Sequence, residues 1–349
     1  MGRARTPLIG RRIGILLAAT AALAIPSLGI AAAPPVHLAS IGPRPMAVAA
    51  GPGFRWGAPM TYDARDGYAV LFGGSVQPAN GPTRLFDDTW TYVGGNWTKL
   101  APAFHPSFRS CVSLAYDAKS GYVLLFGGAN NTREFSDTWT FAGGVWLKLH
   151  PAAAPSPRNC ASMVWDAKDG YMVLFGGDNG KGFLLNDTWS YSRGHWTNIT
   201  PTVSPPGRRS MGMTYDAARG DVVLFGGLGN FGDLADTWTF TNGTWTQLFP
   251  STAPGVRVAP GMTYDGKDKY VLLFGGRDDY TGTVLNDTWT FNGTGWSQLN
   301  PRATPPARNW PAIAYDVKDG YVVMFGGRHT SYGATYLKDT WEFSGGRWY

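Results

Sequence analysis

The segment ASMVWDAKDGYMVLFGGDNGKGFLLNDTWSYSRGHWTNIT, residues 161–200, decides the fold of this 349-residue chain. It contains four short runs rich in β-branched and aromatic residues, at 161–166, 171–177, 187–192 and 195–200, and turn sequences such as DAKDG and SRG join neighbouring runs. This pattern predicts a four-stranded antiparallel meander. A single sheet of this kind would expose both faces, so it needs neighbours that cover them.

The rest of the chain supplies those neighbours, because the same unit is written six times with a period of about 50 residues. Gly-Gly pairs begin at Gly73, Gly127, Gly176, Gly226, Gly275 and Gly326. An Arg lies 18 residues before each pair, at Arg55, Arg109, Arg158, Arg208, Arg257 and Arg308. After each pair come two Trp residues seven positions apart, the first of them in an Asp-Thr-Trp motif.

A period of this length predicts a propeller or a solenoid, and twisted four-stranded sheets stack radially about an axis. The composition of 47 Gly, 15 Trp and 15% charged residues suits short strands joined by tight turns. Helical periodicity is confined to the N-terminus. The expected fold is therefore all-β, a six-bladed β-propeller.

The repeated residues resemble the Kelch repeat, in which an apolar strand runs into Gly-Gly and is followed by a strand bearing Trp, a turn and a second Trp. The resemblance covers residues 54–349. It implies a six-bladed propeller of four-stranded antiparallel Kelch blades. The repeats are similar to those of extracytoplasmic, galactose-oxidase-like Kelch propellers.

The N-terminus has the pattern of an export signal. Four Arg residues precede an apolar run at 13–30, and Ala31–Ala33 offers a small-residue cleavage site. Residues 1–33 are therefore expected to be a secretory signal peptide, with an uncleaved membrane anchor as the alternative, since the run has about 18 residues. Residues 34–53 are either a linker or a segment that closes the ring. The expected location is secreted or extracytoplasmic, with the membrane reached only through an uncleaved N-terminal segment.

The net charge does not indicate a nucleic-acid partner. Removal of residues 1–33, which hold four Arg and no acid, lowers the formal charge of the chain from +6 to +2. No basic stripe is visible outside this leader. The expected partner is an extracellular protein or a glycan.

Loop lengths indicate which face of the propeller carries function. The distance from the first Gly of each pair to the next Trp varies from 12 to 17 residues, while the other three spacings of the repeat are constant. Variable loops on a rigid scaffold are where recognition usually lies. By strand alternation these loops emerge on the same face as the start of the first strand, where the repeat Arg lies.

Two interpretations of the repeat Arg residues remain open. They could form a cationic ring at the mouth of the channel, suited to carboxylate or sulfate groups. Alternatively, each could pair with the Asp that opens the third strand of its unit. These acids are Asp88, Asp137, Asp187, Asp236, Asp287 and Asp339.

Departures from the repeat are stronger functional candidates. Trp56 follows Arg55, and Trp310 follows Arg308 by two positions, where the other units hold smaller or polar residues. Closing the ring makes the first and last units neighbours, so the two Trp should lie close together. They form either a stacking surface for a sugar or peptide, or a plug for the seam. The candidate ligand-binding residues are Arg55, Trp56, Arg308, Asn309, Trp310, Arg328, His329, Tyr332 and Tyr336.

Cys111 and Cys160 occupy the same repeat position in adjacent units. Their Cα atoms must come within about 7 Å for a disulfide to form, a distance that neighbouring inner strands only just approach. Two alternatives remain open for this pair, a disulfide and two small buried thiols.

Signals for catalysis are few. The five His fall at unrelated repeat positions, which predicts no metal site, and no ligand of the galactose-oxidase copper can be matched, so no cofactor is expected. The hypothesis is a binding module for protein or carbohydrate. The alternative is a sugar-active enzyme, mutarotase-, glycosidase- or oxidase-like, with an axial pocket. The architecture resembles the sialic-acid mutarotase family, which places Arg at the channel mouth.

Overall fold

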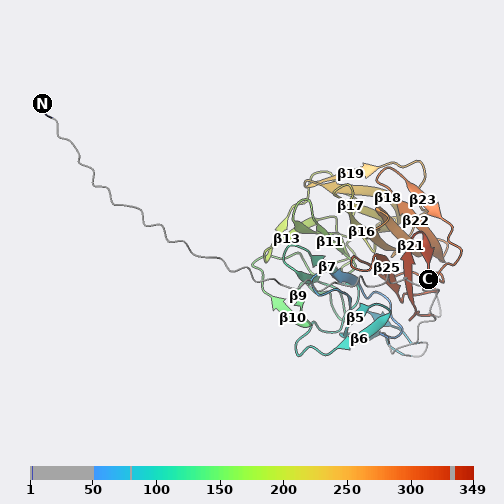
Figure 1. Ribbon diagram of the computed structural model, residues 1–349, viewed down its shortest axis with the longest axis horizontal. Helices are drawn as coiled ribbons and strands as arrows, with labels where there is room; N and C mark the ends of the chain where they lie inside the picture. The colour runs from blue at the N-terminus through green and yellow to red at the C-terminus, as the bar shows by residue number, and fades with distance from the viewer. Residues whose placement is uncertain (1, 3–50, 79–80, 331–334) are drawn as a thin grey trace, which may run out of the picture. The chain divides into compact units, whose positions relative to one another are not determined.

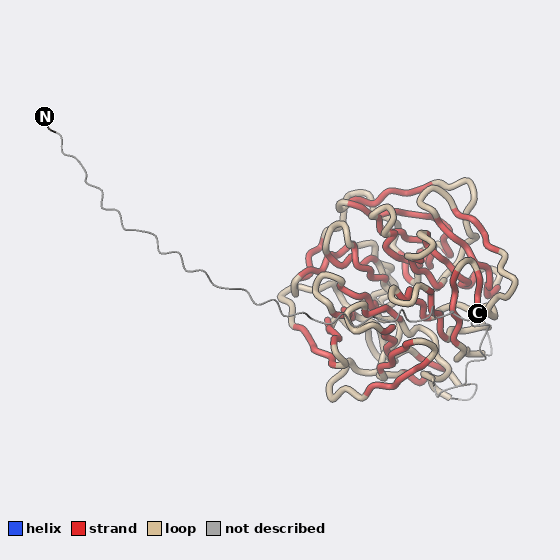
Figure 2. The backbone as a smooth tube through the Cα atoms, viewed as in Figure 1, coloured by secondary structure: helices blue, strands red, loops and turns tan. Residues whose placement is uncertain are grey.

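The computed structural model describes residues 2, 51–78, 81–330 and 335–349. Apart from Gly2, the expected leader lies outside the described residues, as does most of the 34–53 segment. The described residues form strands, turns and loops (Figure 2), and among them no helix is long and apolar enough to cross a membrane.

Six sheets follow one another along the chain, and each is built from one contiguous segment. Blade 1 contains β1 (Met60–Asp63), β2 (Tyr68–Phe72), β5 (Thr89–Val93) and β6 (Asn96–Leu100), with a small extra hairpin of β3 (Ser75–Val76) and β4 (Arg84–Leu85). Blade 2 contains β7 (Ser113–Asp117), β8 (Tyr122–Phe126), β9 (Thr138–Ala142) and β10 (Val145–Leu149). Blade 3 contains β11 (Ser162–Asp166), β12 (Tyr171–Phe175), β13 (Thr188–Ser192) and β14 (His195–Asn198).

The second half of the chain repeats the pattern with longer hairpins in two blades. Blade 4 contains β15 (Arg208–Arg209), β16 (Gly212–Asp216), β17 (Asp221–Gly229), β18 (Gly232–Thr241) and β19 (Thr244–Leu248). Blade 5 contains β20 (Gly261–Asp265), β21 (Tyr270–Asp278), β22 (Thr283–Phe291) and β23 (Trp296–Leu299). Blade 6 contains β24 (Ala312–Asp316), β25 (Tyr321–Phe325), β26 (Thr340–Ser344) and β27 (Arg347–Trp348).

The sheets are arranged around a common centre (Figure 1). First strands such as β7, β11 and β16 lie near the axis, and fourth strands such as β10, β19 and β23 lie at the rim. Neighbouring strands within each blade are antiparallel. The predicted six-bladed propeller of four-stranded antiparallel sheets is confirmed.

Adjacent blades pack through the second Trp of each repeat. The Trp146 ring of blade 2 lies 4.9 Å from the Phe141 ring of its own blade and 5.2 Å from the Phe72 ring of blade 1. Its indole N–H donates to the Thr89 hydroxyl of blade 1 at 2.9 Å. The same arrangement recurs at every blade boundary, so these Trp residues are structural, as the repeat predicted.

The same contacts close the ring between blades 6 and 1. The Trp97 ring lies 4.9 Å from the Phe325 ring, and its indole N–H donates to the Thr340 hydroxyl at 2.9 Å. The backbone N–H of Gly327 donates to the carbonyl of Arg55 at 3.0 Å. The fourth strand of blade 6 is the two-residue β27. The suggested closing role of residues 34–50 lies outside the described residues.

The Gly-Gly pair places one blade directly against the next. In blade 3, Gly176 has a positive φ of 68°, and a Cβ there would lie 2.6 Å from the carbonyl oxygen of Arg208 in blade 4. The backbone N–H of Gly177 donates to that same oxygen at 2.9 Å. Both the backbone conformation and the close approach therefore require glycine at the first position.

Candidate functional site

The start of each first strand and the variable loops lie on the same face. Isolated bridges pair the residue after the repeat Arg with the residue after Gly-Gly, as in Asn159 with Asp178 and Asn309 with Arg328. This confirms the expected geometry. We call this side of the propeller the loop face.

A ring of backbone hydrogen bonds surrounds the axis on the loop face. It is formed by the residue two positions after each repeat Arg, and all six members have a positive φ: Gly57, Cys111, Cys160, Ser210, Ala259 and Trp310. From Cys111 onward, each member donates its N–H to the carbonyl of the preceding member at 2.7–3.0 Å. A left-handed backbone conformation is strained for a residue with a large side chain. Trp310 is therefore the member of the ring whose residue type least favours this conformation.

A cavity of about 290 Å³ opens within this ring and receives side chains from all six blades. We call it the mouth cavity. Its wall includes residues that follow the repeat Arg, such as Trp56 and Arg209, and residues that follow Gly-Gly, such as Arg277 and Arg328. Both sets are carried on rigid strand ends rather than on loop tips.

Trp56 and Trp310 meet across the seam between blades 1 and 6. Their ring centroids are 5.6 Å apart with an interplanar angle of 60°, an edge-to-face contact. The predicted proximity is confirmed. Both rings also line the mouth cavity, so the contact that covers the seam leaves the two indoles available to the cavity as well.

Three arginines and one acid, Asp279, carry charge in the mouth-cavity wall. Arg209 forms a 2.8 Å ion pair with Asp178, and Arg277 forms an ion pair with Asp279. The Arg209 side chain is 38% exposed, so its guanidinium is open to solvent despite the pair. Arg328 lines the same cavity from blade 6.

The six repeat Arg residues lie deeper and are fully engaged. Arg158 is buried, and its guanidinium donates to the carbonyl of Gly176 at 3.0 Å and to both carboxylate oxygens of Asp187 at 2.6 and 2.8 Å. Asp187 also accepts the indole N–H of Trp189 at 2.7 Å. Equivalent Arg-Asp pairs occur in all six blades, which confirms the pairing interpretation. Arg55 and Arg308, offered above as ligand contacts, are 2% and 0% exposed and orient the strand ends that carry Trp56 and Trp310.

The carboxylates of these pairs are held ionised. Burial alone would raise the pKa of Asp187, but the hydrogen bonds and charge of Arg158, together with the Trp189 indole, lower that pKa below its usual range. Asp137 is affected in the same way by Arg109 and Trp139. The repeat cations are thus neutralised internally, and the charge presented at the mouth comes from other residues.

Comparison with known proteins agrees with this architecture. The family model described as the KLHDC2/KLHL20/DRC7 Kelch-repeats domain matches residues 191–348. A solved structure described as "Structure of YjhT" is similar with a TM-score of 0.62 and 14% identity, over 84% of this chain and 95% of that one. Residues 191–348 therefore match a Kelch-repeat family model, and the described residues form a six-bladed β-propeller. At this identity the structural match shows the fold alone, and no curated protein matches the chain.

The remaining candidate ligand-binding residues of this propeller lie in different environments. Asn309 is 1% exposed, and its Oδ1 is buried without a hydrogen-bond partner among the described residues. The His329 Nδ1 lies 2.5 Å from the carbonyl oxygen of Ala307, and Tyr336 is 8% exposed. These three are not part of the mouth-cavity wall as described. Tyr332 lies outside the described residues.

Sequence reasoning missed Arg209 and Arg277. A positional rule would have found both, because the mouth cavity draws on the residue after the repeat Arg and on the residue after Gly-Gly. Arg209 has the same repeat position as Trp56, and Arg277 has the same position as Arg328.

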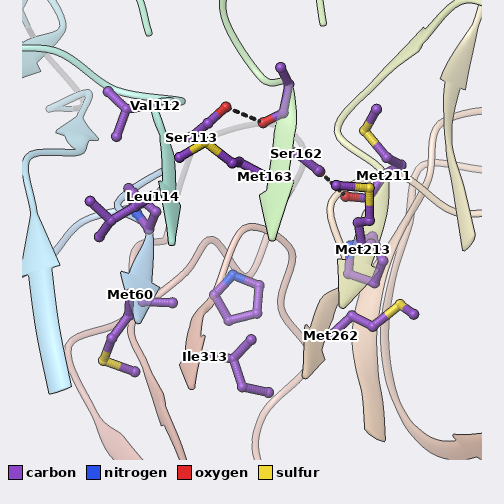
Figure 3. Close-up of a pocket in the computed structure, with 16 residues that line it drawn as sticks. Met60, Val112, Ser113, Leu114, Ser162, Met163, Met211, Met213, Met262 and Ile313 are labelled. Carbon is purple, nitrogen blue, oxygen red and sulfur yellow. Dashed lines mark hydrogen bonds between the residues drawn. The ribbon is translucent and has the colours of Figure 1, made fainter. Parts of the chain in front are cut away.

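The channel below the mouth holds a smaller cavity than the mouth does. A cavity of about 160 Å³ is walled by first-strand residues, where the hydroxyls of Ser113 and Ser162 donate to the carbonyls of Ala161 and Met211 at 2.8 and 3.0 Å (Figure 3). The labelled methionine side chains are spread around the wall and do not meet at a centre (Figure 3). Among the described residues no group of three or more His, Cys, Asp or Glu could hold a metal ion.

The opposite mouth of the channel has a larger cavity, of about 350 Å³. Its aromatic lining comes from one repeat position of the first strand, filled by Tyr or Trp in every blade. Burial raises the pKa of Tyr116 and Tyr215, and nearby carboxylates of the preceding blade, Asp63 and Asp166, raise it further. We assign these aromatics to blade packing, because an aromatic residue occupies this position in every blade. The mouth cavity, by contrast, is lined by residues that differ from blade to blade.

Cys111 and Cys160 are free thiols in this structure. Both line the mouth cavity, from the neighbouring blades 2 and 3. The structure holds the two residues as separate thiols, and their pairing stays a prediction. Cys160 is buried and Cys111 is partly exposed.

Proposed function

We propose that this Kelch propeller is an extracytoplasmic binding module that holds an acidic group of a glycan or protein ligand in the mouth cavity. The observation that carries the proposal is the convergence of Arg209, Arg277 and Arg328 with Trp56 and Trp310 on one cavity. Guanidinium groups bind carboxylates with two parallel hydrogen bonds, and indoles stack on sugar rings or apolar side chains.

One buried polar atom in the wall of this cavity supports the proposal. The indole Nε1 of Trp56 has no hydrogen-bond partner among the described residues. An unpaired buried polar atom costs about 1–3 kcal/mol. A ligand that brought an acceptor could recover part of that cost.

The dimensions of the cavity suit one residue of a larger ligand. A volume of about 290 Å³ lies near the lower end of small-molecule sites, which run from about 300 to 1,000 Å³. The rim adds exposed aromatic side chains on the loops of blades 3, 4 and 5, namely Phe183, Phe231 and Tyr280. We assign the acidic group to the cavity and the flanking residues of the ligand to this rim.

A ligand screen tests the proposal. Thermal-shift and Trp-fluorescence measurements on the full chain against acidic glycans, neutral glycans and acidic peptides should give binding only with the acidic members. A response to glycans alone identifies a carbohydrate module, and a response to peptides alone identifies a protein-binding module. Equal binding of neutral and acidic ligands would contradict the proposal.

Variants locate the binding site. Arg277→Met should weaken binding about tenfold or more, because hydrogen bonds to charged groups contribute about 1.5–3 kcal/mol. Trp310→Gly removes the indole and leaves a residue that tolerates φ of 57°, so it should keep the fold and lose affinity. The matched control is Arg219→Met, on a turn between the first and second strands, where Arg219 pairs only with Asp216 and is 37% exposed. Loss of affinity in the control equal to that in Arg277→Met would place the ligand elsewhere.

One observation favours a sugar-active enzyme as the second candidate. The backbone N–H of Asp279, in the hairpin of blade 5, donates a hydrogen bond of 2.5 Å to the carboxylate of Asp233, in the hairpin of blade 4. Burial raises the pKa of Asp233, and the charges of Asp279 and Asp278 raise it further. A carboxyl with a raised pKa beside an ionised one can act as a general acid or base. Turnover measured in the same screen, and lost in Asp233→Asn with binding retained, would establish the enzyme.

The location of the protein outside the cytoplasm is part of the proposal and rests on the N-terminal pattern. N-terminal sequencing of the protein recovered from its native compartment distinguishes the two forms. A chain that begins near residue 34 supports a cleaved signal peptide, and a membrane-associated chain that retains residues 1–33 supports an anchor. An intact chain in the cytoplasm would contradict export.

A further inference from the structure

The only two cysteines of the chain are held side by side by the ring of backbone hydrogen bonds. The N–H of Cys160 donates to the carbonyl of Cys111 at 2.8 Å. A carbonyl oxygen lies about 2.4 Å from its own Cα, and an amide nitrogen about 1.5 Å from its own Cα, so the two Cα atoms are at most about 6.7 Å apart. Disulfides join Cα atoms that are about 4.4–6.8 Å apart.

The side chains are oriented for the same reaction. Both residues have a left-handed φ, 55° for Cys111 and 52° for Cys160, so the two Cβ atoms leave the ring in equivalent directions. Both side chains line the same cavity from neighbouring positions of the ring. Bond formation therefore needs side-chain rotation and no rearrangement of the blades.

We propose that Cys111 and Cys160 form a reversible disulfide that joins blades 2 and 3 in the wall of the mouth cavity. The Cys111 thiolate attacks a small disulfide such as oxidised glutathione, forming a mixed disulfide and releasing one glutathione thiol. The Cys160 thiolate then attacks the Cys111 sulfur and releases the second glutathione thiol. Two protein thiols are oxidised to one disulfide, and the two electrons and two protons end on the two glutathione molecules.

Burial sets the order of the two steps. Cys111 is partly exposed on the cavity wall, whereas Cys160 is buried. Burial also raises the pKa of the Cys160 thiol, as does the neighbouring Cys111, which disfavours Cys160 as the first nucleophile. The proposal is independent of the ligand of the mouth cavity, since it depends only on the two thiols and an oxidant.

The folded full-length chain treated with oxidised glutathione tests the proposal. Thiols are counted after denaturation without reductant, and linked peptides are identified by mass spectrometry. We expect loss of both thiols, a Cys111–Cys160 peptide, a mass lower by two hydrogen atoms and a higher melting temperature. Cys160→Ser should stop at a stable glutathione adduct on Cys111, and Cys111→Ser should react slowly. Two remaining free thiols, or glutathione on both cysteines of the wild type, would overturn the proposal.

Moving the pair around the ring controls for the geometry. Cys111→Ser combined with Ser210→Cys keeps neighbouring positions, because the Ser210 N–H donates to the Cys160 carbonyl at 3.0 Å, so this variant should also form a disulfide. Cys160→Ser combined with Ala259→Cys places the thiols three positions apart on the ring, with blades 3 and 4 between them, and should form none. A disulfide within the monomer of the second variant would contradict the geometric argument, and thermal melts confirm that each variant is folded.

Discussion

At the scale of single residues, the Asp that opens the third strand links three parts of its blade. Asp187 accepts hydrogen bonds from Arg158, which lies ahead of the first strand, and from Trp189 in the third strand, while Arg158 also holds the end of the second strand at Gly176. The constant spacing of Arg, Gly-Gly and Asp-Thr-Trp in the sequence reflects this link. The sequence therefore offered this pairing as one of two interpretations, and the choice between a paired and an open arginine needed the distances.

Removal of a repeat Arg should lower the free energy of unfolding more than removal of an Arg from an ion pair in the mouth cavity. Arg158→Met leaves Asp187 and the Gly176 carbonyl without their cation, so we expect a loss of about 3 kcal/mol in the free energy of unfolding. Arg209→Met removes the 38%-exposed partner of Asp178 and should cost less than about 1 kcal/mol. Denaturant titrations of the two variants measure the difference. Equal losses would show that the repeat pairs are not structural.

The pH dependence of stability follows from the direction of the Asp187 pKa shift. Because the folded-state pKa lies below the usual 3.8, the pair stabilises the protein fully above that value, and the stabilisation is lost as pH falls through the lower folded pKa. Asp187→Asn should be less stable at pH 7 and should lose less on acidification to about pH 2.5 than the wild type. Thermal melts across this range measure the difference, and parallel curves for the two proteins would contradict it.

At the scale of elements, the junction between the second strand and the loop face is fixed by the Gly-Gly pair. At Gly176 the backbone has a positive φ and a carbonyl of the next blade lies close to the Cα, and both features require glycine. Loop length predicted which face would vary, and that is confirmed. The residues of the mouth-cavity wall could not all be predicted from the sequence. The wall depends on which strand-end positions face the axis, and only the closure of the six blades into a ring determines those positions.

Two alanine substitutions separate backbone strain from close contact. Gly182→Ala changes a loop glycine with φ of 82° and open space around the added Cβ, so it should cost about 1–2 kcal/mol. Gly176→Ala adds the same strain and also places its Cβ 2.6 Å from the Arg208 carbonyl, so it should cost clearly more. Unfolding free energies of the two variants test this. Equal costs would mean that blades 3 and 4 do not depend on the close approach.

At the scale of the whole molecule, the propeller closes by repeating between blades 6 and 1 the contacts found at the other boundaries. Between blades 2 and 3, Trp196 packs on Phe126 and donates to the Thr138 hydroxyl. Trp97 makes the equivalent contacts at the seam. The period of the sequence predicted the number of blades. It could not predict the mode of closure, because the last strand is cut short after Trp348 and its pairing cannot be read from the pattern.

The seam should therefore contribute to stability as much as an internal boundary does. Trp97→Phe and Trp196→Phe each remove one indole hydrogen bond and part of a ring contact, and we expect similar falls in melting temperature. A chain lacking residues 34–45 should melt close to the wild type. A small effect of Trp97→Phe together with a large effect of the deletion would show that the N-terminal segment closes the ring.

The central claim is that the loop face binds a ligand through the mouth cavity. Hydrogen exchange of the full chain, with and without the tightest acidic ligand of the screen, tests it most directly. The account predicts slower exchange at residues 56–57, 110–111 and 277–279, with no change in the turns at residues 63–67 and 216–220. Protection confined to those turns, or absent from the loop face, would contradict it.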